Sequence, residues 1–97
     1  MLLTRQTLQP KREAILEIAR RYGAHDVRIF GSVARGDNTE ASDLDFLVRF
    51  EPTRSLFDYG GMIVDLEELL GVKVDVISEG GMRDRLRARV RKEAVPL

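Results

Sequence analysis

The stretch IFGSVARGDNTEASDLDFLVRF, residues 29–50, decides the fold of this chain. It leaves an apolar strand end, turns through Gly31 and Ser32, crosses a polar loop, and re-enters strand-like sequence that carries Asp43 and Asp45. Because the side chains of a strand alternate between its two faces, Asp43 and Asp45 are predicted to point the same way. Two close carboxylates repel each other unless a cation lies between them, and a hard divalent ion such as Mg²⁺ fits that need.

The turn at the start of this stretch has the composition of a phosphate site. Gly31 permits a phosphate to approach the backbone closely, and Ser32 opens a predicted helical turn whose free N–H groups and hydroxyl face an anion. Arg35 could bind the same phosphates through its guanidinium, although a solvated side chain is an equally good interpretation. For Gly31 and Ser32 alone an ordinary turn would be the simpler interpretation, but at this distance from the Asp-x-Asp pair it is not.

A third carboxylate is predicted to join this pair through the fold. Residues 72–77 are expected to form a strand whose valines share one face, which leaves Asp75 on the other. A helix is predicted between Ser55, which can cap its start, and Gly71, which can end it. A strand–helix–strand unit of this length implies a right-handed crossover that can lay the third strand beside the second. Asp75 can then lie next to the Asp-x-Asp pair.

The segments before this stretch are explained by packing alone. Apolar residues recur at helical spacing over residues 11–22, which predicts a helix, and residues 26–30 alternate as a strand does. His25 is expected to lie in the loop before that strand. It is left out of the site because no partner stands at metal-binding spacing.

The C-terminal segment, residues 82–94, combines arginine at every second position with apolar residues at helical spacing. Its composition favours a helix, whose apolar side, including Leu86, is expected to pack on the sheet. The arginines are interpreted first as a solvated face with intrahelical ion pairs such as Arg89 with Glu93. The alternative is a surface that docks an acidic partner or RNA.

Composition narrows the classes of protein further. The 97 residues suffice for one domain, residues 1–97, and 43% hydrophobic with 33% charged residues is typical of a globular protein. The formal net charge of zero argues against a global electrostatic grip on nucleic acid. Cysteine is absent, which excludes disulfides and thiolate sites. No apolar run reaches membrane-spanning length and no secretory signal is recognisable, so a cytoplasmic location is expected. The oligomeric state stays open.

The spacing of these residues is similar to a known signature. Gly31-Ser32, ten intervening residues and Asp43-Leu44-Asp45 resemble the G-S-x₁₀-D-x-D motif of the DNA polymerase beta-like nucleotidyltransferase superfamily. Residues 31–36 and 42–45 resemble its minimal branch, the MNT proteins, which are often paired with HEPN proteins in bacterial and archaeal toxin–antitoxin modules. The similarity continues through three further segments, residues 65–71, 73–77 and 93–97.

The resemblance implies a fold, a reaction and a partner. The fold would be α/β, a small mixed sheet with flanking helices. Asp43 and Asp45 would hold two Mg²⁺ ions, Asp75 would help to ligate one of them and activate the attacking hydroxyl, and Gly31-Ser32 would seat a nucleoside triphosphate. The reaction would transfer a nucleoside monophosphate, AMP from ATP, to a tyrosine of a HEPN-type toxin, so that the chain would act as an antitoxin.

Two other functions stay open from the sequence. The first is an antitoxin that neutralises its partner by binding alone; the presence of all three aspartates places it second. The other is a nucleotidyltransferase that acts on a small molecule. The short chain argues against this function, because such enzymes usually need a second domain to enclose the substrate.

Overall fold

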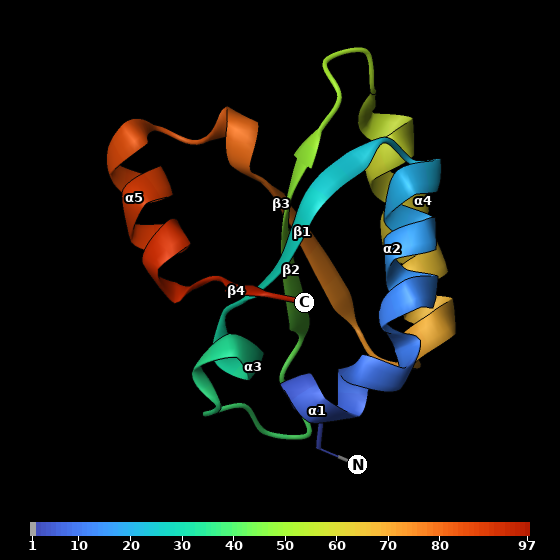
Figure 1. Ribbon diagram of the computed structural model, residues 1–97, viewed down its shortest axis with the longest axis vertical. Coiled ribbons are helices and arrows are strands. Elements are labelled where there is room, and N and C mark those ends of the chain that lie inside the picture. Colours follow the sequence, from blue (N-terminus) through green and yellow to red (C-terminus); the bar gives the residue numbers. More distant parts are fainter. Residues whose placement is uncertain (1) are drawn as a thin grey trace.

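Four strands and seven helical segments make up the computed structural model, which describes residues 2–97 (Figure 1). In chain order they are α1 (Arg5–Leu8), the 3₁₀ turn η1 (Gln9–Lys11), α2 (Arg12–Arg21), β1 (Ala24–Phe30), α3 (Ser32–Arg35), β2 (Leu44–Phe50), α4 (Leu56–Leu70), β3 (Val74–Ser78), the 3₁₀ turn η2 (Glu79–Gly81), α5 (Asp84–Glu93) and β4 (Val95–Pro96).

The strands form one mixed sheet in the order β3-β2-β1-β4. β1 pairs antiparallel with β2 and with β4, whereas β2 and β3 are parallel and α4 connects them. Helices α2 and α4 cover one face of the sheet, and α5 lies on the other side (Figure 1). The predicted α/β fold and the predicted parallel pairing of the second and third strands are confirmed.

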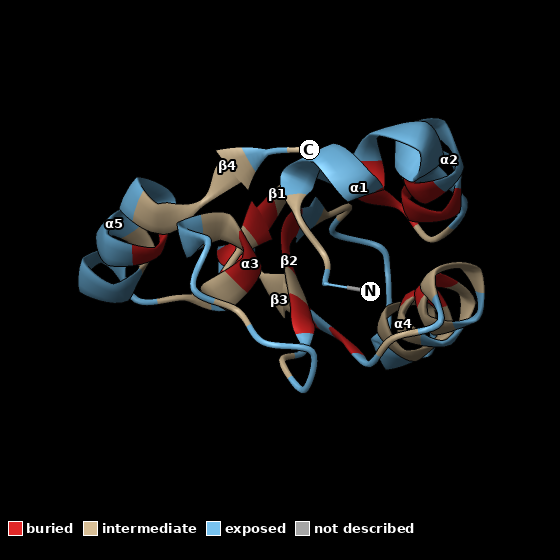
Figure 2. Cartoon of the chain, turned by 90° about the horizontal axis from the view of Figure 1, so that it is seen from below, coloured by how far each residue is buried: buried red, intermediate tan, exposed pale blue. Residues whose placement is uncertain are grey.

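β2 is the centre of the core. Leu44, Phe46 and Val48 point into the layer between the sheet and the helices and are fully buried, and Leu47 on the opposite face is buried as well. Other buried residues of this core lie on α2, β1, α4 and β3, whose buried segments are red in Figure 2. They are Ile15, Ile18, Ala19, Ile29, Met62, Leu66, Val74 and Val76. Burial on both faces explains the unbroken apolar run of this strand.

The N-terminal elements differ from the prediction at their boundaries. The helix expected over residues 11–22 is observed as α2, which follows α1 and η1. Pro10 lies inside the 3₁₀ turn η1, where its missing N–H costs least. β1 begins at Ala24, so the expectation that His25 lies in a loop is wrong. The His25 ring lies 2.9 Å from Glu51 Oε1 across the end of the sheet. This contact gives the lone histidine a structural partner.

Helix α4 follows the prediction closely. Ser55 and Asp58 form a reciprocal capping box at its start, and Gly71 ends it in a left-handed conformation. Gly61 allows α4 to pack closely against the end of α2, because an added Cβ would lie 2.5 Å from Cε1 of Tyr22, the residue that follows α2. β3 begins at Val74, two residues later than the predicted start at residue 72. No helix within residues 2–97 combines the length and the apolar character needed to cross a membrane.

The orientation of α5 corrects the sequence prediction. Leu86 is 48% exposed, whereas Val90 is 5% exposed and is the buried residue of the helix. The expectation that the Leu86 side packs on the sheet is therefore wrong. Residues 87, 90 and 91 share the inward side instead, because Arg91 forms an ion pair with the buried Glu79. Glu93 pairs with Arg35 at 3.6 Å, and within residues 2–97 it forms no pair with Arg89.

Candidate functional site

The three predicted carboxylates come from two neighbouring parallel strands. Asp45 is the second residue of β2 and lies directly opposite Asp75 of β3 in the strand register. Asp43 immediately precedes β2. Because Leu44 and Phe46 point into the core, Asp45 lies on the face that α2 and α4 leave uncovered. The fold thus brings all three predicted residues to one region of the open face.

Gly31 brings the predicted phosphate turn against the same carboxylate. Phe30, the last residue of β1, is the register partner of Asp45 on the other side of β2. Gly31 follows at φ 80°, and a Cβ at this position would collide with Oδ2 of Asp45. Only glycine combines this backbone conformation with so close an approach. The predicted turn and the predicted aspartates therefore belong to one site.

The turn after Gly31 is a single helical turn, α3, that begins at Ser32 as predicted. Gly31, which precedes α3, has no side chain that could cap the turn. The first backbone N–H groups of α3 are therefore left able to donate hydrogen bonds to a ligand. Gly36 closes the turn in the left-handed conformation. Ser32 is half-buried beside Gly31, at the end of the turn that lies next to Asp45.

Arg35 lies at the other end of α3 and is exposed. Its Nε donates to Asp37 at 3.1 Å, and its Nη1 lies 3.6 Å from Glu93 of α5. The hydrogen bond with Asp37 and the charges of both carboxylates raise the pKa of the Arg35 guanidinium. Arg35 also lowers the pKa of Asp45, so its charge reaches the aspartates. Its predicted contact with a nucleotide stays a prediction.

The electrostatics of the site show an excess of negative charge. Burial raises the pKa of the Asp45 carboxyl above its ordinary value, and the charges of Asp75 and then Asp43 raise it further. Arg35 offsets only part of this effect. A bound cation would relieve the repulsion between the carboxylates. The donor set, carboxylate oxygens on an open face, fits Mg²⁺.

The aspartates are near one another without forming a closed ligand set. Among residues 2–97, no three acidic, histidine or cysteine side chains are grouped closely enough to hold a metal ion. Asp75 turns along its own strand, where its Oδ1 accepts a hydrogen bond of 3.0 Å from the backbone N–H of Val76. Asp43 and Asp75 are both exposed, so their side chains can reorient without repacking the core.

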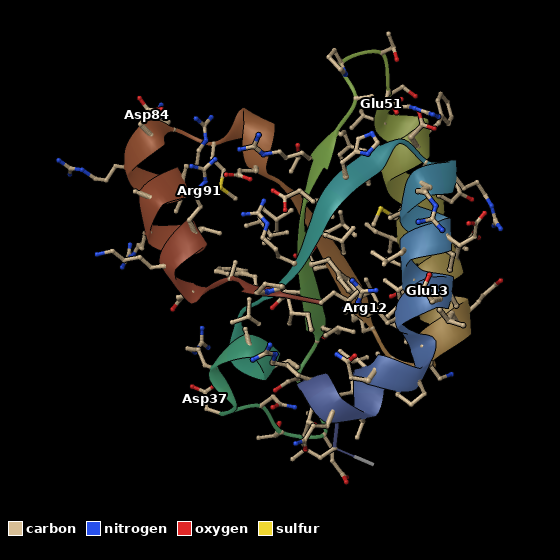
Figure 3. All side chains as sticks on the ribbon, in the orientation of Figure 1. Arg12, Glu13, Asp37, Glu51, Asp84 and Arg91 are labelled. Atoms are coloured by element: carbon tan, nitrogen blue, oxygen red, sulfur yellow. The ribbon has the colours of Figure 1, made fainter. Side chains whose placement is uncertain are left out.

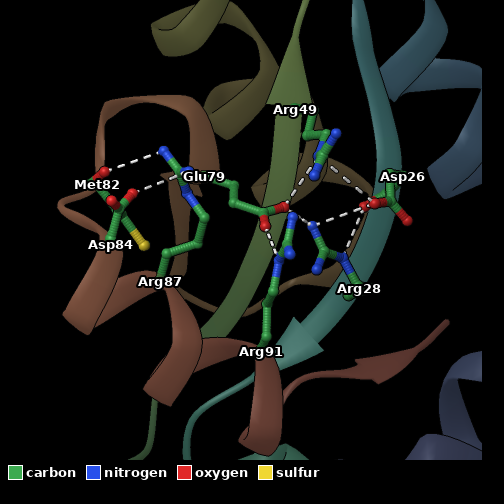
Figure 4. A network of polar contacts seen from close by, with 8 residues as sticks. All are labelled: Asp26, Arg28, Arg49, Glu79, Met82, Asp84, Arg87 and Arg91. Carbon is green, nitrogen blue, oxygen red and sulfur yellow. Dashed lines mark hydrogen bonds and ion pairs between the residues drawn. The ribbon is translucent and has the colours of Figure 1, made fainter.

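Sequence reasoning missed a second charged cluster on the same open face, the Glu79 cluster, defined as Glu79 with Arg28, Arg49 and Arg91 (Figure 4). Glu79 is 1% exposed and interacts with an arginine from each of β1, β2 and α5. Hydrogen bonds from Arg49 and Arg28 lower the pKa of Glu79 to about 2, against the opposing effect of burial. In the sequence, the signal for this cluster was the presence of arginines on the open side of two neighbouring strands.

Comparisons with known proteins agree with this geometry. The family described as "Nucleotidyltransferase domain" matches residues 11–97. The chain is 40% identical to "Putative protein adenylyltransferase MJ0435" of Methanocaldococcus jannaschii over 84% of this chain and 87% of that protein. It is 35% identical to "Protein adenylyltransferase MntA" of Thermococcus cleftensis over 81% of this chain and 80% of that protein.

Solved structures give the same result. A "putative minimal nucleotidyltransferase" superposes with a TM-score of 0.87 at 52% sequence identity, over 98% of this chain and 97% of that one. A toxin–antitoxin structure with AMP-PNP superposes with a TM-score of 0.73 over 87% of this chain and 69% of that one, and at 20% identity it supports the fold alone. This chain belongs to the nucleotidyltransferase domain family, in its minimal branch.

Proposed function

We propose that this chain transfers AMP from ATP to a tyrosine hydroxyl of a HEPN-type toxin and acts as its antitoxin. The observation that carries the proposal is the register of β2 and β3, which sets Asp45 opposite Asp75 while Gly31 lies against Asp45. The names of the relatives, which are protein adenylyltransferases, support a protein as the acceptor. The HEPN-type partner follows from the resemblance to MNT proteins.

Asp43, Asp45 and Asp75 are the residues that would hold Mg²⁺, two ions by family resemblance. Bound Mg²⁺ supplies positive charge to the attacking and leaving oxygens of a phosphoryl-type displacement. The protein contributes the position of these carboxylates on rigid strands, and Gly31 and Ser32 contribute backbone and hydroxyl groups that bind the triphosphate.

The transfer itself is an in-line displacement at the α-phosphorus of ATP. The tyrosine oxygen forms a bond to this phosphorus, the bond to the bridging oxygen of the pyrophosphate breaks, and pyrophosphate leaves. The proton of the hydroxyl passes to the carboxylate of Asp75. AMP remains on the tyrosine and adds a phosphodiester charge there.

The test is the intact mass of a purified HEPN-type partner after incubation with the chain, ATP and Mg²⁺. We expect the mass to rise by one or more adenylyl groups located on tyrosine, and no change when Mg²⁺ is chelated or when Asp45→Asn replaces the native chain. Asp84→Asn is the control, because Asp84 is fully exposed on α5. An unmodified partner that is nevertheless neutralised, by the native chain and by Asp45→Asn alike, would replace catalysis with occlusion.

A further inference from the structure

Positive charge is concentrated at the C-terminal end of the chain. Residues 82–97 contain six basic and two acidic residues, a net charge of +4, so residues 1–81 carry −4 in a chain whose total is zero. This separation is invisible in the overall composition. It places a local basic surface on a protein that shows no global attraction for anions.

The basic residues of α5 divide into two sides. On the inward side, Val90 is buried, Arg91 pairs with Glu79, and Arg87 donates to the carbonyl oxygen of Met82 at 3.0 Å. Figure 3 shows Arg91 reaching from α5 toward the sheet. Arg85, Arg89 and Lys92 occupy the other side at positions i, i+4 and i+7, and we call these three residues the outward basic stripe.

The outward basic stripe has no partner within the part of the chain that the structure describes. Among residues 2–97, none of its three members forms an ion pair or a side-chain hydrogen bond. Arginines on the other side of the sheet do pair, as Arg20 does with Glu17 and Arg21 with Asp65. Like charges at i and i+4 are mildly unfavourable within a helix, so interactions among these three side chains do not stabilise α5.

The position of α5 is fixed relative to the candidate site. Glu79 and Arg91 hold its inward side to the sheet, and Glu93 at its end lies 3.6 Å from Arg35 of α3, the turn that begins beside Asp45. α5 and α3 both lie on the side of the sheet away from α2 and α4 (Figure 1). A protein seated on α5 therefore lies on the same side of the molecule as the aspartates.

We propose that the outward basic stripe docks the acceptor protein through an acidic surface of that protein. The inference rests on the proposed function and adds the surface and the charge of the partner that fits it. Charge complementarity of this kind steers encounter and fixes orientation. Leu86, 48% exposed and one turn from Arg89, adds an apolar contact to the charged stripe. Residues 82–97 contain no aromatic side chain, so the stacking platforms that hold single-stranded RNA are missing from this segment.

The experiment measures binding of three fluorescent probes to the full chain by anisotropy, without ATP or Mg²⁺. The probes are an acidic tyrosine-containing peptide, a neutral peptide of the same length and a single-stranded RNA. Arg85→Glu/Arg89→Glu is compared with Arg5→Glu/Arg20→Glu, which changes the net charge equally on α1 and α2. We expect the acidic peptide to bind roughly tenfold more weakly to the α5 variant and within about twofold of native to the control.

Each of the following results would overturn the proposal: equal loss in both variants, equal binding of the neutral peptide, or α5-dependent binding that favours RNA. A native dimer that the α5 variant dissociates would assign the stripe to a second copy and would also overturn it. If the α5 variant does not fold, the salt dependence of acidic-peptide binding to the native chain tests the proposal instead. Docking through the stripe requires that this binding weakens as salt is added. If the acidic peptide docks on α5 but no AMP is transferred, only the proposed function is refuted. If AMP is transferred but docking does not depend on α5, only this inference is refuted.

Discussion

Asp45 and Glu79 are carboxylates on the same uncovered side of the sheet, near opposite ends of β2, and their surroundings differ in charge. Glu79 is buried among three arginines, which lower its pKa to about 2. Asp45 lies near two further carboxylates. Its pKa is raised, and Arg35 offsets only part of this shift. A carboxylate whose charge is balanced inside the protein stabilises the fold, whereas one whose charge is left unbalanced is available for a cation from outside.

The largest expected effect tests the unbalanced cluster. Asp75→Asn should slow AMP transfer by ~10²–10⁴-fold, because it removes the proposed proton acceptor. The fold should persist, since Asp75 is exposed and the amide is nearly isosteric. Transfer rates and thermal melting of the variant, with Asp84→Asn as control, measure both expectations. Transfer at the native rate would remove Asp75 from the site.

The next effect tests the balanced cluster. Glu79→Gln leaves Arg28, Arg49 and Arg91 without their shared counter-charge, so the free energy of unfolding should fall by about 3 kcal/mol. Chemical denaturation measures it, and Glu17→Gln, which breaks an exposed pair with Arg20, should leave stability unchanged. Equal effects of the two substitutions would show that burial of Glu79 contributes nothing.

A smaller effect is expected to distinguish alanine substitutions at the two glycines of the phosphate turn. Gly31 and Gly36 both have φ 80°, but ψ is −151° at Gly31 and 15° at Gly36. Alanine should strain the left-handed backbone of Gly36 by roughly 1–2 kcal/mol and that of Gly31, in a region that essentially only glycine adopts, by more. An added Cβ at Gly31 also collides with Asp45, whereas at Gly36 it meets nothing within 4 Å. Gly31→Ala should therefore lose about 10²-fold in AMP transfer through displacement of Asp45, and Gly36→Ala should not. Equal transfer rates would show that Asp45 need not lie against this turn.

The smallest effect is the acid dependence of stability. Glu79 has a lowered pKa in the folded state, so its contribution is present above its ordinary pKa of 4.5 and is lost as pH falls toward about 2. Asp45 has a raised pKa, so its ionisation costs stability as pH rises above its ordinary value of 3.8. Between pH 4.5 and 2, Glu79→Gln should flatten the loss of stability measured by denaturation. Asp45→Asn should instead remove the gain in stability that the native chain has as pH falls toward 3.8. The reverse order would invalidate the assignment of the two environments.

Much of the candidate site was predictable because its determinants are local. Gly31, Ser32, Asp43 and Asp45 lie in one continuous stretch, and strand alternation predicts a shared direction for the two carboxylates. Asp43 itself lies just before β2. The bounds of β2 and the cap of α4 at Ser55 also follow from neighbouring residues. The start of β1 was missed because His25 and Asp26 are polar and Asp26 has a left-handed backbone at the irregularity of the strand.

The sequence by itself determined the strand–turn–strand unit and the chemistry that its residues can perform. Only the tertiary structure decided that Asp75 stands opposite Asp45, since the register depends on pairing between strands separated by α4. It alone decided that Glu79 is buried, because the three arginines that balance its charge come from β1, β2 and α5. It also decided which side of α5 faces inward, because Arg91 finds its buried partner Glu79 on that side and Val90 is buried there, whereas Leu86 stays 48% exposed.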